Sequence, residues 1–450
     1  MTNIKFMKLN IVFFPLARVT FSMPDAEDNF NKSCALLEGL FGAINRPEGL
    51  ITSPMMLSNF ADTIVQPDLI IYQCTTFIGG DFVTELTRRF NCPVIIWALR
   101  EPSIDGGRLK LNSLTGAFSA GNSLYMQGHD FQFVLGSPDE PEVSKKIHQT
   151  FRALEMVKKL KNLVIGVIGS QPAGFGFGAV DEAQLAGKLG TRIIQTEASG
   201  IMKKAASYTP DEFSASLAEL KSHSSGWEKL PEESLQKHSR LRKAYQDFID
   251  ENKVGVIASR CWPDFFTDFG APVCSVLSLL NDSGVAASCE TDIGGVITMF
   301  IGSDLAGGPT YLGDPVAIDE SCDAIVFWHC GAGATSLSRK KEGPQLGVHP
   351  NRKIGPTMEF GLKAGEVTIL RLGKDQHGFR LFVMKAEALD EPRKFLGTSV
   401  TVRPEGGKSL EKVGQFIKDG WEPHFVVAYG DIVQELRLLG GFLNIPVWEY

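Results

Sequence analysis

Four side chains are candidate metal ligands because each lies beside an apolar segment of the chain. Glu290 lies in CETDIGG, Asp314 in YLGDP, His329 in FWHCG and His424 in EPHFVVAYGD. Charged groups in such surroundings cost free energy unless they are paired or bind a cation. Carboxylate oxygen with imidazole nitrogen suits Mn²⁺, Co²⁺, Fe²⁺ or Mg²⁺ better than ions that prefer thiolates. The alternative is that the two acids are helix caps or ion-pair partners and that both histidines are core residues.

Other motifs do not indicate nucleotide binding or hydrolase chemistry. The glycine-rich run GSQPAGFGFG at 169–178 follows a predicted strand and precedes a predicted helix, as a dinucleotide fingerprint does. Its spacing is not G-x-G-x-x-G, and we interpret it as a tight strand-to-helix turn. The chain contains neither a phosphate-binding P-loop motif nor the G-x-S-x-G nucleophile elbow. Cys330 lies beside His329, but no positioned base is visible for it, which favours a packing role.

The composition is that of a globular protein whose partners are small molecules. The chain has 450 residues, a formal net charge of -7, 43% hydrophobic and 22% charged residues. A mildly acidic protein repels nucleic-acid phosphate, so a nucleic-acid partner is not expected. Eight cysteines without a C-x-x-C pair are typical of reduced thiols in a cytoplasmic protein. No apolar run approaches the ~18 residues that a membrane helix needs, and no secretion signal is expected.

The positions of apolar residues predict two α/β domains followed by a β-rich domain. In residues 1–160 and again in 161–340, short apolar strands alternate with segments of helical period, which is typical of parallel βαβ units. The strands predicted there are 10–16, 68–74, 93–99, 163–169, 192–195, 254–258 and 323–328. Residues 341–450 contain Val-, Thr- and Phe-rich strands separated by Gly and Pro. The predicted fold is therefore two doubly wound α/β domains and a mainly antiparallel C-terminal β domain.

Several of these segments together resemble the L-fucose and L-arabinose isomerase superfamily. The matching segments are CETDIGGVITM, YLGDP, VFWHCGAGATSL, HFVVAYGD, WALREPSIDGGRLKLNSLTG and QCTTFIGGDFVTEL. The resemblance implies that Glu290 and Asp314 bind a divalent metal and that His424 is a further ligand from the C-terminal domain. His329 matches a fourth ligand of the arabinose-type branch, whereas the fucose-type branch has no histidine there.

The resemblance also implies the activity and the assembly. It implies a Mn²⁺-dependent isomerase that interconverts an aldose and its ketose, with Glu290 and Asp314 as base and acid of an enediol route. A homohexamer is implied in which the N-terminal domain of a neighbouring subunit closes the pocket. Arg18, Trp97 and Asn112 lie near predicted strand ends of that domain, where α/β proteins bind ligands, and are candidate sugar contacts. The alternative is that none of them binds sugar: Arg18 would then form a surface ion pair, Trp97 would be a core residue and Asn112 a turn residue.

The substrate depends on the branch of the superfamily. The chain is shorter than L-fucose isomerase, and its motifs are similar to those of the sulfoquinovose isomerases, which make sulfofructose. Sulfoquinovose is therefore the expected substrate. A neutral aldose, as in the L-fucose and L-arabinose isomerases, is the alternative within the superfamily. A non-catalytic sugar-binding protein is the alternative of another class, and it would need no metal at Glu290 or Asp314.

Overall fold

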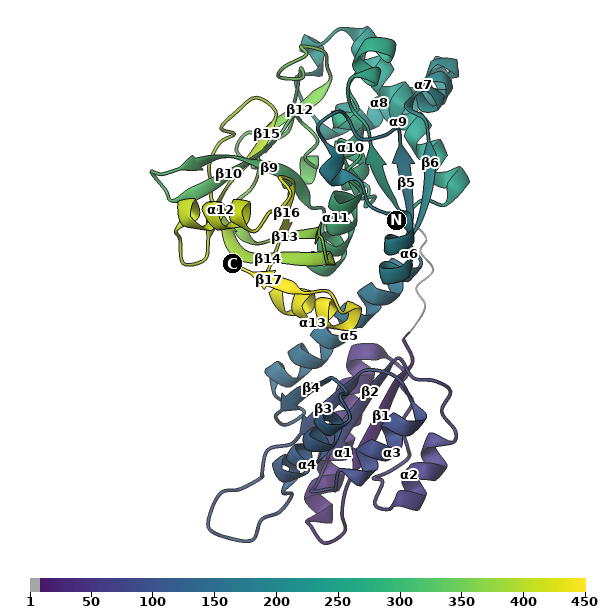
Figure 1. The fold of residues 1–450 in the computed structure, drawn as a ribbon, viewed down its shortest axis with the longest axis vertical. Coiled ribbons are helices and arrows are strands. Elements are labelled where there is room, and N and C mark those ends of the chain that lie inside the picture. Colours follow the sequence, from purple (N-terminus) through teal and green to yellow (C-terminus); the bar gives the residue numbers. More distant parts are fainter. Residues whose placement is uncertain (1–8) are drawn as a thin grey trace. The chain divides into compact units, whose positions relative to one another are not determined.

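The structure is a computed structural model that describes residues 9–450, and these form two compact units (Figure 1). One unit comprises residues 9–155 and the other residues 156–450. The predicted domain boundaries at residues 160 and 340 remain predictions. Each unit is described by itself below.

The unit of residues 9–155 is built on a four-stranded parallel sheet with the order β1-β2-β3-β4. Its first three strands are fully buried and mostly apolar, as parallel strands covered by helices are, whereas the fourth, at the edge of the sheet, is only partly buried. The strands are β1 (Ile11–Leu16), β2 (Leu69–Cys74), β3 (Val94–Ala98) and β4 (Phe131–Leu135). The helices are α1 (Met23–Phe41), α2 (Pro54–Ala61), α3 (Asp81–Arg89), α4 (Ser113–Met126) and α5 (Pro141–Lys161), the last of which continues into the next unit.

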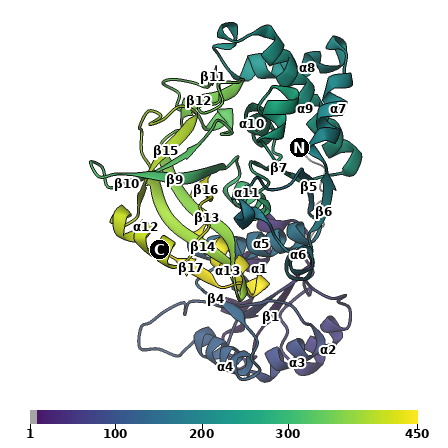
Figure 2. The same cartoon turned by 45° about the horizontal axis from the view of Figure 1, so that its top comes forward.

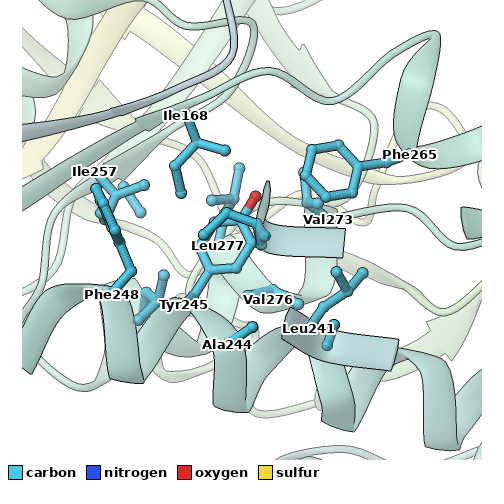
Figure 3. Close-up of a cluster of buried hydrophobic side chains, with 14 of the residues drawn as sticks. Ile168, Leu241, Ala244, Tyr245, Phe248, Ile257, Phe265, Val273, Val276 and Leu277 are labelled. Atoms are coloured by element: carbon cyan, nitrogen blue, oxygen red, sulfur yellow. The ribbon is translucent and has the colours of Figure 1, made fainter. Parts of the chain in front are cut away.

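The unit of residues 156–450 begins with a second parallel sheet, ordered β6-β5-β7-β8. Its strands are β5 (Val164–Ile168), β6 (Arg192–Thr196), β7 (Val256–Ser259) and β8 (Ala287–Ser288). Its helices are α6 (Glu182–Leu189), α7 (Ala198–Ser207), α8 (Pro210–His223), α9 (Glu232–Asn252), α10 (Cys274–Asp282) and α11 (Ile293–Ala306). Figure 3 shows the core beneath this sheet, where side chains of α9 and α10 surround Tyr245. The Tyr245 hydroxyl lies 2.6 Å from Ser259 Oγ, which satisfies the polar atoms of both residues at the end of β7.

A nine-stranded sheet with the order β11-β12-β15-β10-β9-β16-β13-β14-β17 forms the rest of this unit. Most neighbouring pairs are antiparallel. The strands are β9 (Tyr311–Asp319), β10 (Ala324–His329), β11 (Gln345–Gly347), β12 (Thr357–Gly361), β13 (Gly365–Asp375), β14 (Gly378–Ala388), β15 (Thr398–Pro404), β16 (Phe425–Tyr429) and β17 (Val447–Glu449). The helices α12 (Ser409–Lys418) and α13 (Val433–Leu443) accompany it.

Helix α11 lies between the two sheets of this unit. It contacts β7 and β8 of the parallel sheet and β9, β13 and β16 of the antiparallel sheet, and both views show it between them (Figures 1 and 2). Ten of its fourteen residues are buried. The residues at its N-terminus are therefore held between both sheets, where the candidate ligands also lie.

The predicted fold class is confirmed: parallel α/β sheets precede a mainly antiparallel β-sheet. One strand belongs to a different sheet from the one expected. Residues 323–328 were predicted as part of the central α/β domain, but β10 pairs with β9 and β15 in the nine-stranded sheet. Within residues 9–450, no helix is long and apolar enough to cross a membrane.

Candidate metal centre and active site

Three adjacent strands of the nine-stranded sheet position three of the candidate ligands. Asp314 lies within β9, His329 is the last residue of β10, and His424 directly precedes β16. In the sheet, β9 lies between β10 and β16. Gly313 pairs with Phe425, so the next pair along the two strands consists of Asp314 and His424. The register of the sheet therefore brings together residues that are more than a hundred positions apart in the chain.

Glu290 reaches the same place from the parallel sheet, through an unusual turn between β8 and α11. Both Glu290 and Thr291 have left-handed backbone conformations, with φ values of 58° and 52°. Such conformations cost free energy in residues other than glycine and are often found at functional sites. The Thr291 N–H donates to Ser259 O, and Asp292 caps α11 by accepting the Gly295 N–H at 2.8 Å. The turn thus directs the Glu290 carboxylate toward the nine-stranded sheet.

The candidate ligand atoms converge on His424. Its Nε2 lies 3.1 Å from Glu290 Oε2 and 3.3 Å from Asp314 Oδ1. His329 Nε2 lies 4.0 Å from Glu290 Oε2, and ligand atoms of Glu290, His329 and His424 lie within 4.8 Å of one another. His424 is fully buried, whereas the Asp314 side chain is 30% exposed. This group of buried ligand atoms could hold a metal ion.

Behind His424 lies Asp292, a residue for which the sequence suggested no role. Its Oδ2 is 2.9 Å from His424 Nδ1, and its two oxygens also accept hydrogen bonds from the Arg371 guanidinium. Both Asp292 and Arg371 are almost completely buried. Burial alone would raise the pKa of Asp292, but the charges of Arg371 and His424 lower it well below its ordinary value. Asp292 is therefore an anion, and it accepts a hydrogen bond from His424 only if the imidazole carries a proton on Nδ1.

This arrangement leaves Nε2 of His424 as the atom that faces the two carboxylates. It is a buried nitrogen without a hydrogen-bond partner. Burial alone would lower the pKa of His424, but the hydrogen bond to Asp292 and the nearby carboxylates of Glu290 and Asp314 raise it to about 9. The carboxylates of Glu290 and Asp314 therefore favour a positive charge at this nitrogen, either a proton or a metal ion. A carboxylate behind a histidine is also the usual support of a metal-binding imidazole.

The surroundings of Asp292 are too close-packed for additional side-chain atoms. A Cβ at Gly295 would lie 2.4 Å from Asp292 Oδ2, and a Cβ at Gly178 would lie 2.9 Å from the Asp292 Cα. Gly178 belongs to the glycine-rich run at 169–178, whose spacing predicts only a tight turn. The same run brings Phe177 to 5.0 Å from the His424 ring, edge to face. It therefore forms part of the wall of the candidate site.

His329 has a different hydrogen-bonding state from His424. The Cys330 backbone N–H donates to His329 Nδ1 at 3.0 Å. A nitrogen that accepts a hydrogen bond carries no proton, so the neutral ring has its proton on Nε2. Nε2 is the atom that faces Glu290. In this geometry His329 is a hydrogen-bond donor toward the site rather than a lone-pair ligand.

The two carboxylates differ in their surroundings. Glu290 Oε1 accepts the indole N–H of Trp262 at 3.1 Å, which fixes its orientation. Burial raises the pKa of Asp314, although the neighbouring His424 and His329 act in the opposite direction. Asp314 is thus the acid that retains a proton more readily than an ordinary aspartate.

The three candidate sugar contacts lie in the unit of residues 9–155. The Arg18 guanidinium is exposed and lies 5.1 Å from the centroid of the Phe77 ring. Trp97 is completely buried and donates its indole N–H to Gly136 O, as a core residue does. Asn112 precedes α4 in a left-handed conformation, with φ at 52°. Their role in binding sugar remains a prediction.

Sequence reasoning missed Asp292, Arg371 and Trp262. Asp292 was present in the quoted CETD segment, and its position before an apolar helix is a sequence signal for an N-cap. Arg371 lies in the middle of an apolar strand, where a buried charge requires a partner. Trp262 had no signal that connects it with Glu290.

Comparison with known proteins identifies relatives that match nearly the whole chain. No family model matches the chain. The chain is 43% identical to the sulfoquinovose isomerase of Clostridium sp. (strain MSTE9) over 98% of its own length and 99% of that protein. It is 40% identical to the sulfoquinovose isomerases of Alkalicoccus urumqiensis and Priestia aryabhattai, again over 98% of its length and 99% of theirs. These similarities extend over nearly the whole chain and confirm the branch that its motifs resemble. The chain therefore belongs to the sulfoquinovose isomerase family.

Proposed function

We propose that this protein is a metal-dependent isomerase that converts sulfoquinovose to the ketose sulfofructose. The substrate follows from the names of its relatives. The chemistry rests on one observation: the partnerless Nε2 of buried His424 faces the carboxylates of Glu290 and Asp314. A cation there would satisfy this nitrogen; the ligand atoms of Glu290, His329 and His424 lie within 4.8 Å of one another, and Asp314 Oδ1 lies 3.3 Å from His424 Nε2.

Glu290, Asp314 and His424 would hold the metal. Two carboxylate oxygens and one imidazole nitrogen fit Mn²⁺, with Co²⁺, Fe²⁺ and Mg²⁺ as alternatives. When bound, the ion would supply Lewis acidity to the substrate oxygens O1 and O2. His329 would complete the ligand set only if its ring gave up the hydrogen bond from Cys330.

The two carboxylates would also carry the proton transfer. In the aldose-to-ketose direction, one carboxylate removes the proton from C2 while O1 gains a proton, which yields an enediol. The proton on O2 is then lost, and C1 receives a proton, so the carbonyl group moves from C1 to C2. Asp314 is suited to this exchange because burial raises its pKa, so that it holds a proton more readily than an ordinary aspartate. Glu290, oriented by Trp262, would face the other end of the reacting bond.

Deuterium labelling tests this proposal. The purified protein with Mn²⁺ should convert sulfoquinovose to sulfofructose and incorporate deuterium from D₂O at C1 of the ketose. A product without deuterium would indicate a hydride shift, and no conversion would contradict the proposed substrate. Glu290→Gln and Asp314→Asn should each abolish turnover while the fold is retained. Asp282→Asn, a carboxylate that binds Thr335 and Ser336 away from the ligands, is the matched control and should stay active.

The same experiment separates the alternatives. Conversion of L-fucose or L-arabinose with no reaction of sulfoquinovose would favour a neutral aldose as substrate. Sugar binding without turnover, by a protein that purifies without metal, would favour a non-catalytic sugar-binding protein.

We also propose a cytoplasmic homohexamer in which neighbouring subunits share active sites. All eight cysteines are free thiols, which suits a reducing compartment. The assembly follows from the superfamily resemblance, which implies that the N-terminal domain of a neighbour, with Arg18, Trp97 and Asn112, closes the pocket. Mass measurement by light scattering tests the hexamer, and Arg18→Ala should raise the KM if that side chain contacts the sugar.

A further inference from the structure

Arg352 is a half-buried cation without a carboxylate partner. It lies in the loop between β11 and β12. Its guanidinium carbon is 4.9 Å from the centroid of the Trp262 ring and 5.1 Å from that of Phe266. Among residues 9–450, no acid forms an ion pair with it. The aromatic rings cover the guanidinium without using its N–H donors, which remain available to an anion.

Two other arginines of the same region are already neutralised. Arg371 pairs with Asp292 behind His424. Arg260 pairs with Asp264 at 2.7 Å. Of these three arginines, Arg352 is the one whose charge is left over. A positive charge held in place without a counter-ion is suited to an anionic ligand.

Trp262 connects Arg352 with the candidate active site. The indole that carries the guanidinium on its face also donates its N–H to Glu290 Oε1 at 3.1 Å. Because only the indole ring separates these two contacts, the guanidinium carbon lies within roughly 10 Å of the Glu290 carboxylate. Phe175 also packs against this indole, with the two rings edge to face and their centroids 5.7 Å apart.

This separation matches the length of the proposed substrate. From C1 of sulfoquinovose to the sulfonate sulfur there are six bonds, as many as in two residues of extended backbone, or roughly 7 Å. A sugar with O1 and O2 beside Glu290 and Asp314 would therefore bring its sulfonate within reach of a group about 10 Å away. The sulfonate is a permanent anion whose three oxygens suit the planar fork of a guanidinium.

We propose that Arg352, held against Trp262, binds the sulfonate group and selects the sulfonated sugar over neutral aldoses. This inference rests on the proposed function. It assigns the sulfonate to a residue of the same unit that holds the candidate metal ligands. Glu290 would then orient the sugar at one end through the metal, and Arg352 at the other end through its charge, with Trp262 supporting both.

Kinetics of Arg352→Gln test the assignment. The KM for sulfoquinovose should rise about 30- to 100-fold, as expected for the loss of a charge-assisted pair that is not deeply buried, whereas kcat should stay within about threefold. Arg352→Lys should recover part of the loss, because it keeps the charge but not the planar fork. Lys353→Gln is the matched control, an exposed cation next in the same loop, and it should leave the KM unchanged. A fall in kcat without a rise in KM, or an equal loss in Lys353→Gln, would overturn the assignment.

A binding measurement separates this inference from the proposed function. The alditol made by reducing sulfoquinovose keeps the sulfonate and has no carbonyl to isomerise. By calorimetry, wild-type protein should bind it, Arg352→Gln should bind it about 30- to 100-fold more weakly, and both should bind unsulfonated glucitol equally weakly. If the wild type converts no sulfoquinovose but shows this binding difference, the proposed reaction fails and the sulfonate site stands. Equal alditol affinities for wild type and Arg352→Gln, or no binding by either, would refute the site.

Discussion

Replacement of Asp292 by asparagine probes the support of the candidate metal centre. The asparagine keeps the shape of the side chain but removes the anion that requires the proton on His424 Nδ1. Loss of such a supporting carboxylate typically weakens metal binding 10- to 100-fold. The substitution also leaves the buried Arg371 without its partner, which should lower the free energy of unfolding by about 3–5 kcal/mol.

The two effects can be measured apart. Calorimetric titration of metal-free protein with Mn²⁺ gives the affinity, and urea unfolding without metal gives the stability. The double variant Asp292→Asn/Arg371→Met removes both buried charges, so it should recover most of the stability but not the Mn²⁺ affinity. Asp282→Asn should leave the affinity unchanged. The reasoning is refuted if folded Asp292→Asn or the double variant binds Mn²⁺ within twofold of wild type.

Three further results are expected. His424→Gln should weaken Mn²⁺ binding at least 100-fold, whereas His329→Gln should change it less than tenfold because its Nε2 carries the proton; equal losses in calorimetry would contradict this difference. Dialysis against EDTA should abolish isomerase activity, and Mn²⁺ should restore it; full activity of protein shown by mass spectrometry to be metal-free would exclude the metal. Burial, aided by the charge of Arg242, lowers the pKa of His238 to about 3. Because the folded-state pKa lies below the ordinary 6.5, the neutral His238 ring contributes fully to the free energy of unfolding above pH 6.5. This contribution should fall by about 2 kcal/mol at pH 5. In urea unfolding, the free energy of unfolding of His238→Gln should therefore fall less than that of wild type between pH 7 and pH 5. An equal fall in both proteins would contradict this role of His238.

Sequence periodicity located most of the regular elements because their side chains face a core on one side or are buried on both. The strand predicted at 68–74 is β2 at Leu69–Cys74, and the strand predicted at 163–169 is β5 at Val164–Ile168. Two elements beside the site were not predicted. Helix α11 is apolar on all sides because it lies between two sheets, so it has no amphipathic period. Strand β9 contains Pro315, which argues against a central strand, and the pairing of β9 with β10 shifts its register beside this proline, where Val316 is left unpaired.

The sequence by itself determined which residues could serve as ligands, since acids and imidazoles beside apolar segments need partners wherever they lie. It also determined the family, through motifs that extend along the whole chain. Only the tertiary structure decided which of these groups meet. The pairing of β9 with β16 puts Asp314 beside His424, and the left-handed turn at Glu290 adds the second carboxylate. The roles of Asp292 and Arg352 depend on contacts across 132 and 90 residues, with His424 and Trp262 respectively, and no local pattern records such long-range contacts.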